Sequence, residues 1–98
     1  MYNDTDKFEW DNAKAVHNFA KHGVSFEEAE WAFADPHRFI IRDETHSITE
    51  KRFFCFGKVD GRVMTVRFTY RGDTIRLIGA AYWRKGDKIY ETQGRKKD

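Results

Sequence analysis

The spacing of apolar residues along the chain predicts helices first and strands after them. Between residues 11 and 23, Ala13, Val16 and Ala20 recur at helical spacing, the first position is a good N-cap, and Gly23 stands where a left-handed stop belongs. This pattern predicts a first helix over residues 11–23.

The next segment carries a stronger helix signal. Ser25 and Glu28 are spaced as a capping box, and Pro36 closes the segment because the residue before a proline is disfavoured in a helix. Three apolar residues between these signals form a stripe for burial: Phe26, Ala29 and Phe33. The two helices, joined at Gly23, are expected to form an αα-hairpin.

After Pro36 the apolar pattern acquires the period of strands. Four strands are predicted, at residues 38–42, 50–57, 62–71 and 74–81. The dipeptides Asp60-Gly61 and Gly72-Asp73 suit two-residue hairpin turns, and a polar loop covers residues 43–49. A short helix is predicted over residues 84–93, and residues 92–98 are expected to be a frayed basic tail.

The two hairpin turns fix a register that sorts the strand residues onto two faces. The first face is almost wholly apolar and suits a core: Phe53, Cys55, Met64, Val66, Phe68, Tyr70, Ile75 and Leu77. The second face carries Arg52, Phe54, Thr65, Arg67, Thr69, Arg71, Arg76 and Ile78. Arg52, Thr69 and Arg76 fall in one cross-strand row. Because like charges on neighbouring strands repel, we expect an anion to bind over this second face.

Length and composition indicate one cytoplasmic domain spanning residues 1–98, and the pattern of helices and strands makes its class α+β. The chain is 40% apolar and 35% charged, which excludes both disorder and a membrane protein. No apolar run approaches the length of a membrane span, and residues 1–11 lack the apolar core of a signal peptide. The lone Cys55 cannot form an internal disulfide and is predicted to be a buried packing residue.

The charges are distributed unevenly. Residues 1–50 hold five Lys/Arg and eleven Asp/Glu, whereas residues 51–98 hold thirteen Lys/Arg and five Asp/Glu. A polyphosphate bound by the basic half would explain this asymmetry. Complementary charges within the fold would explain it equally well.

Arginines interleaved with aromatic residues suit RNA, because guanidinium groups bind phosphates and flat rings stack on bases. The aromatic candidates are Phe54, Tyr70, Tyr82 and Trp83. The alternative is that Arg67 and Arg71 pair with acids of the helical hairpin, such as Glu27, Glu28 or Glu30.

Histidines are the acid–base candidates for attack by an RNA 2′-hydroxyl. His22 and His46 stand in polar turns, while His17 and His37 read as ordinary surface residues. No metal-ligand spacing and no nucleotide-cofactor motif occurs in the sequence, so neither a metal nor a cofactor is expected.

A series of short motifs resembles the BrnT family of toxins. They are Phe8-Glu-Trp-Asp11, Asn18, Lys21-His-Gly-Val-Ser-Phe-Glu-Glu-Ala29, Phe33, Asp35-Pro36, Asp43, His46-Ser47, Glu50, Arg52-Phe53, Gly57, Phe68-Thr-Tyr-Arg71 and Ile75-Arg76. The resemblance implies a type II toxin–antitoxin ribonuclease that cleaves RNA without metal. It also implies a RelE-like fold, with two N-terminal helices packed on a twisted antiparallel sheet and a short C-terminal helix.

The same resemblance implies site residues and a partner. The catalytic candidates are Lys21, His22, Arg52, Tyr70 and Arg76. The RNA-binding candidates come instead from the basic sheet face and the segment that follows it: Arg67, Thr69, Arg71, Trp83, Arg84 and Lys85. The implied partner is a BrnA-like ribbon-helix-helix antitoxin, through which alone the toxin would reach operator DNA. Many family members have Ser-Ala-Arg where this chain has Gly79-Ala80-Ala81, and Arg84 is the candidate substitute. The alternative function is a non-catalytic RNA- or antitoxin-binding module that acts as a co-repressor.

Overall fold

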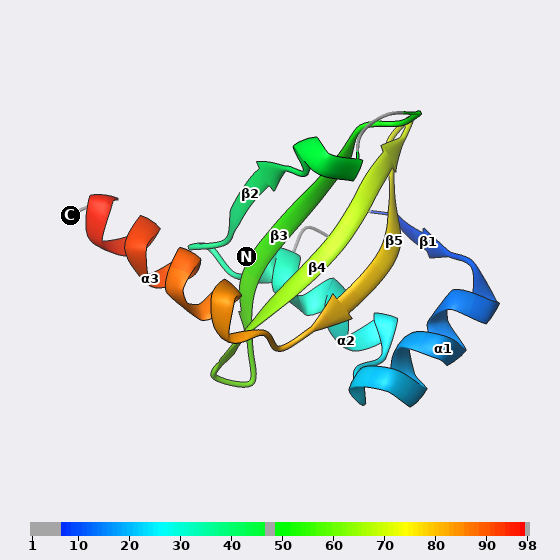
Figure 1. The fold of residues 1–98 in the computed structure, drawn as a ribbon, viewed down its shortest axis with the longest axis horizontal. Coiled ribbons are helices and arrows are strands. Elements are labelled where there is room, and N and C mark those ends of the chain that lie inside the picture. Colours follow the sequence, from blue (N-terminus) through cyan, green and yellow to red (C-terminus); the bar gives the residue numbers. More distant parts are fainter. Residues whose placement is uncertain (1–6, 47–48, 98) are drawn as a thin grey trace.

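The computed structural model describes residues 7–46 and 49–97 of the chain (Figure 1). The strands are β1 (Lys7–Trp10), β2 (Phe39–Arg42), β3 (Arg52–Val59), β4 (Arg62–Arg71) and β5 (Thr74–Ala81). The α-helices are α1 (Asn12–His22), α2 (Phe26–Glu30) and α3 (Arg84–Lys97). Two short 3-10 helices follow α2 and β2, namely η1 (Trp31–Ala34) and η2 (Glu44–His46). The fold is therefore α+β, as predicted.

The five strands form one mixed sheet in the order β1-β5-β4-β3-β2. β1 runs parallel to β5, and all other neighbours are antiparallel. The prediction of a wholly antiparallel sheet without β1 was therefore wrong. β1 is only four residues long and pairs with a strand more than sixty residues away, so no local turn signals it.

The predicted register is confirmed where it matters for the site. Arg52 pairs with Thr69, and Thr69 pairs with Arg76. Beyond that row, a bulge shifts the pairing, so that Arg67 lies opposite Gly79. Ile78 is the extra residue of β5 at this irregularity, and it changes the local course of the strand.

The core lies between the sheet and the segment made of α2 and η1. Phe26, Ala29 and Phe33 are at most 4% exposed, as the predicted stripe requires. The Phe33 ring meets the Phe68 ring edge-on at 5.1 Å between centroids. Ser25 and Glu28 form the predicted capping box, in which each side chain bonds the other residue's backbone N–H.

The helix α1 forms where predicted but is oriented by a polar residue. Asp11 caps it by accepting from the Ala13 and Lys14 amides, and Gly23 ends it at a φ of 70°. The apolar residues whose spacing predicted the helix remain exposed, and Val16 is 69% exposed. Asn18 is instead the buried residue of the helix.

The helix α3 lies on the opposite face of the sheet from α2, across the ends of β3 and β4 (Figure 1). Gly86 permits this approach, because a Cβ there would collide with the Thr65 hydroxyl and crowd the Phe56 ring. The helix continues to Lys97, well beyond the predicted end at residue 93. No helix in the described part of the chain is long and apolar enough to cross a membrane.

Candidate active site

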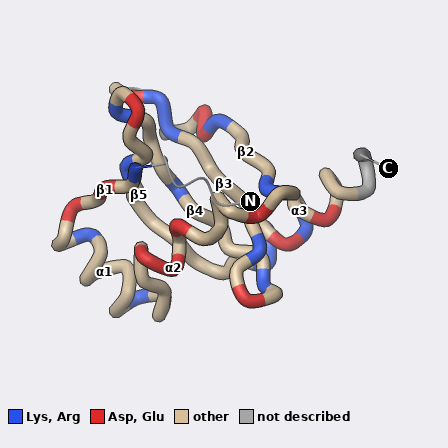
Figure 2. Tube along the Cα trace, turned by 180° about the vertical axis from the view of Figure 1, so that it is seen from behind, with Lys and Arg blue, Asp and Glu red and all other residues tan. Residues whose placement is uncertain are grey.

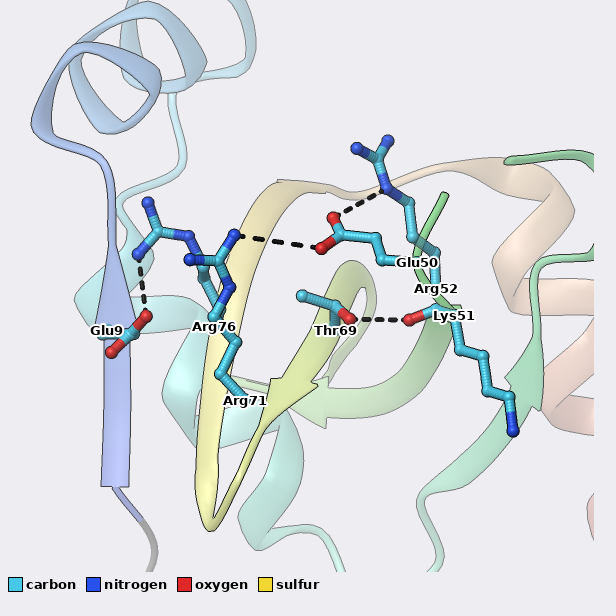
Figure 3. Close-up of polar contacts among 7 residues, drawn as sticks. All are labelled: Glu9, Glu50, Lys51, Arg52, Thr69, Arg71 and Arg76. Atoms are coloured by element: carbon cyan, nitrogen blue, oxygen red, sulfur yellow. Dashed lines mark hydrogen bonds and ion pairs between the residues drawn. The ribbon is translucent and has the colours of Figure 1, made fainter. Parts of the chain in front are cut away.

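The predicted row of arginines exists, but acidic residues neutralise it (Figure 3). Arg76 Nη1 lies 2.8 Å from Glu9 Oε2, which β1 brings alongside β5. Glu50 lies between two guanidinium groups, with its oxygens 3.4 Å from Arg52 Nε and 3.8 Å from Arg71 Nη2. Carboxylates of the fold therefore compensate these arginines, so the repulsion between them does not by itself require a bound anion.

Thr69, at the centre of this row, is 3% exposed. Its hydroxyl donates a hydrogen bond of 2.6 Å to the Lys51 carbonyl, as Figure 3 shows. The Thr69 hydroxyl at the middle of the row is therefore already hydrogen-bonded within the protein, which leaves it unable to donate to a ligand.

Arg67 is paired with the buried carboxylate of Asp43. Its Nε lies 3.8 Å from Asp43 Oδ2, too far for a hydrogen bond, and this buried Nε has no hydrogen-bond partner among the described residues. The guanidinium also sits over the Phe54 ring at 5.5 Å. The alternative pairing of Arg67 and Arg71 with acids of the helical hairpin was wrong, since their partners are Asp43 and Glu50.

A pocket of about 350 Å³ opens beside Arg67, between α1 and the sheet. Its polar lining comes from two distant parts of the chain, and Trp83 stands at its side. The lining residues are His17, Asn18, Lys21, His22, Thr65, Arg67, Ile78, Gly79, Ala80 and Trp83. The pocket therefore gathers two imidazoles, an ammonium, a guanidinium and an indole.

Asn18 positions the α1 side of the pocket. Its Nδ2 donates to the carbonyls of Val24 and Ala80, both at 3.0 Å, and its Oδ1 accepts from the Ala80 amide at 3.1 Å. β1 pairs only with the first half of β5, so the Asn18 amide occupies the edge of β5 beyond β1. The last turn of α1 is thereby held over the sheet.

Residues 10–87 match the family model described as the ribonuclease toxin, BrnT, of type II toxin–antitoxin systems. The chain belongs to the BrnT family. No curated protein matches the chain. The match spans α1, the pocket and all four arginines of the face, while Glu9 lies one residue before it. A toxin of this class acts together with an antitoxin, so the family also implies a protein partner.

The structure divides the catalytic candidates of this BrnT-family chain into three places. Lys21 and His22 lie in the pocket, whereas Arg52 and Arg76 lie in the row. Tyr70 lies on the other face of the sheet, where its ring contacts Phe53 and Phe68 at centroid distances of 5.3 and 5.2 Å. Tyr70 is thus separated from the arginines by the thickness of the sheet.

The RNA-binding candidates are divided between the pocket, the start of α3 and the arginine row, where Thr69 and Arg71 lie. Arg67 and Trp83 line the pocket, and Trp83 is 43% exposed with its ring edge-on to His22 at 6.1 Å. Arg84 and Lys85 are exposed at the start of α3. Tyr82 does not join this set, because its ring packs at the core and against the Arg62 guanidinium at 3.9 Å.

His17 is the pocket residue that sequence reasoning missed. It was assigned to the helix surface, yet it lines the pocket together with Lys21, one helical turn later. That i, i+4 spacing was the available signal, because residues four apart share a helix face. The side chain of His46, the other histidine candidate, lies outside the described part of the chain.

Figure 2 shows acidic residues along α2, which packs against the core side of the sheet. Among the residues that the structure describes on the arginine face, four arginines meet three carboxylates, those of Glu9, Asp43 and Glu50. These described residues have a positive charge balance, and the pocket adds Lys21 to it.

In the described part of the chain, the arginine face contains neither a thiol nor a cluster of metal-ligating side chains. Cys55 is fully buried on the core side, and burial raises the pKa of its thiol to about 12, so it is the packing residue that was predicted. Within residues 7–46 and 49–97, no group of three or more His, Cys, Asp and Glu side chains is placed to hold a metal ion.

Proposed function

We propose that this chain is a metal-independent endoribonuclease that cleaves RNA in the pocket between α1 and the sheet. The observation that carries the proposal is the meeting of His17, Lys21 and His22 with Arg67 and Trp83 around one cavity. Cleavage by the RNA's own 2′-hydroxyl needs a base, an acid and a cation at the phosphate, and these side chains supply all three.

The reaction begins when one imidazole, that of His22, removes the proton of the 2′-hydroxyl. The 2′-oxygen then bonds to the adjacent phosphorus, and the bond from phosphorus to the 5′-oxygen breaks. His17, protonated, donates its proton to the departing 5′-oxygen. The products are a 2′,3′-cyclic phosphate and a free 5′-hydroxyl, and histidine suits both roles because it exchanges protons near neutral pH.

Arg67 and Lys21 stabilise the extra negative charge of the phosphorane. The Arg67 guanidinium is available for this role because its side chain is 31% exposed, lines the pocket and makes only a long contact with Asp43. Trp83, exposed at the pocket, stacks on an unpaired base beside the scissile bond.

Arg52, Arg71 and Arg76 bind flanking phosphates in this proposal. They lie on the same face of the sheet as Arg67, farther from the pocket. An extended RNA chain that leaves the pocket therefore passes over them. A phosphate must compete there with Glu9 and Glu50, so this contact is weaker than the contact in the pocket.

The proposal extends to partner and location. We infer a RelE-like fold, a BrnA-like ribbon-helix-helix antitoxin that alone contacts operator DNA, and a cytoplasmic site of action. The alternative is a protein that binds RNA without cleaving it. This alternative arises because the Gly79-Ala80-Ala81 segment lacks the arginine that many family members have there. Ala81 is 2% exposed, and the exposed Arg84 is the nearest following arginine.

A cleavage assay on purified protein tests the catalytic proposal. His22→Gln and Arg67→Gln should each slow cleavage of a defined RNA by about a hundredfold, the usual effect of losing one transition-state contact. His37→Gln, an exposed histidine outside the pocket, is the matched control and should cleave normally. Cleavage should persist in excess EDTA and leave 2′,3′-cyclic phosphate ends.

Two results would contradict this account. Activity abolished by EDTA and restored by Mg²⁺ would exclude a metal-independent reaction. RNA that is retarded by the wild-type protein in a gel but never cut would establish the binding module instead.

A further inference from the structure

The helix α1 presents an apolar stripe to solvent. Ala13, Val16, Phe19 and Ala20 share one side of the helix and are all exposed. Val16 is 69% exposed and Phe19 is 57% exposed. The stripe covers two helical turns, about 10 Å. Single exposed apolar residues are ordinary, but a contiguous stripe of this kind marks an interaction surface.

The fold itself holds the stripe outward. The three hydrogen bonds of Asn18 to Val24 and Ala80 fix the rotation of α1, and turning Val16 or Phe19 inward would break all three. The outward orientation is therefore a built feature of the native state, with buried polar bonds that maintain it.

The surroundings of the stripe are basic. Lys14, His17 and Lys21 border it on one side, and α1 contains no Asp or Glu. Neither lysine forms an ion pair with any residue that the structure describes. A complementary partner therefore carries apolar side chains flanked by carboxylates.

These charges select among possible occupants. A second copy of this chain would pair the stripe with itself and bring the lysines of both copies together, which is repulsive in a two-fold contact. RNA could stack a base on Phe19, but it has no aliphatic side chains to pack against Val16 and Ala20. A protein segment with acidic flanks fits both the stripe and its border.

We propose that the apolar stripe of α1, with Lys14 beside it, is the surface that docks the antitoxin of this toxin. The antitoxin segment that fits is amphipathic, with apolar anchors over Val16 and Phe19 and carboxylates toward Lys14 and Lys21. His17 and Lys21 belong both to the border of the stripe and to the pocket, so a docked segment covers one wall of the pocket. The inference that the docked antitoxin blocks RNA cleavage by covering the pocket rests on the proposed function. The inference that the antitoxin docks on the stripe does not.

Calorimetric titration of the full-length cognate antitoxin into the purified toxin tests the docking surface. Val16→Ser and Phe19→Ser should each weaken binding about 30-fold or more, as loss of an interface hot spot does. Lys14→Glu should weaken it about fivefold at low salt, and less at high salt. Trp31→Ser is the matched control, because Trp31 is 58% exposed on η1, and it should bind normally.

Thermal melts and RNA cleavage accompany each titration. All four variants should melt near the wild-type temperature and, with no antitoxin present, cleave RNA at the wild-type rate. Unchanged antitoxin affinity in both apolar variants would overturn the proposal. A wild-type dimer that Phe19→Ser converts to a monomer would assign the stripe to a second copy, and loss of RNA binding would assign it to RNA. An inactive wild type whose antitoxin binding still depends on Phe19 would refute only the cleavage mechanism.

Discussion

Asn18 is the residue whose replacement tests the architecture of the pocket most directly. It is 7% exposed, and its amide makes three hydrogen bonds, two to Ala80 and one to Val24. Asn18→Leu keeps a side chain of similar size but can neither donate nor accept. The variant therefore leaves the edge of β5 beyond β1 without its partner.

The size of the effect follows from these bonds. Each contributes about 1 kcal/mol net, and leaving the buried Ala80 groups unpaired adds about 1 to 3 kcal/mol more. We expect the free energy of unfolding to fall by about 4 to 6 kcal/mol, a large part of the roughly 5 to 15 kcal/mol typical of a whole domain. A loss of about 4 kcal/mol should lower the Tm by roughly 16 to 32 °C in a chain of this length.

Urea unfolding followed by circular dichroism and tryptophan fluorescence measures this loss. Asn12→Leu is the matched control, because Asn12 is an exposed asparagine of the same helix, and its effect should stay within about 0.5 kcal/mol. Asn18→Asp retains an acceptor for the Ala80 amide but loses both donated bonds, so it should be destabilised as well. A cost below about 1 kcal/mol for Asn18→Leu would refute the role of Asn18 as the anchor of α1.

Three further predictions concern the core, pH and RNA affinity. Phe68→Ala should lower the free energy of unfolding in urea by about 3 to 5 kcal/mol, because Phe68 is fully buried and its truncation leaves a cavity. A loss below about 1 kcal/mol would show that Phe68 does not lie in the core. Burial alone would raise the pKa of Asp35, but hydrogen bonds from the β3 backbone and the Tyr90 hydroxyl lower it below 3.8. The resulting stability should be complete above that pH and lost as the pH falls through the lowered pKa, and acid titrations of Asp35→Asn should not show this loss. Glu9→Gln should tighten RNA binding severalfold in filter assays by releasing Arg76, and weaker binding would contradict the competition between carboxylate and phosphate.

Local signals in the sequence were sufficient for most elements. The capping pair Ser25–Glu28 and the stop at Gly23 act within a few residues, so they predict helix ends without any knowledge of the tertiary fold. The two hairpin dipeptides likewise fixed the register that puts Arg52, Thr69 and Arg76 in one row.

The compensation of the arginines could not be predicted in this way. Glu9 reaches Arg76 only because β1 adds to the edge of the sheet, and Asp43 reaches Arg67 from the loop after β2. Such ion pairs depend on which segments become neighbours in space, and the sequence pattern of either partner does not contain that information.

What the sequence determined by itself is the set of helices and strands from α1 to α3, the core face of the sheet and the family, because these follow from short-range periodicity, turn chemistry and motifs. Only the tertiary structure decided the rotation of α1 about its axis. The spacing of Val16 and Ala20 predicted a helix, yet the hydrogen bonds of Asn18 to Ala80 outweigh the burial of those small side chains. This rotation of α1 brings His17, Lys21 and His22 to the pocket that Arg67 lines, and it leaves the apolar stripe of α1 facing solvent.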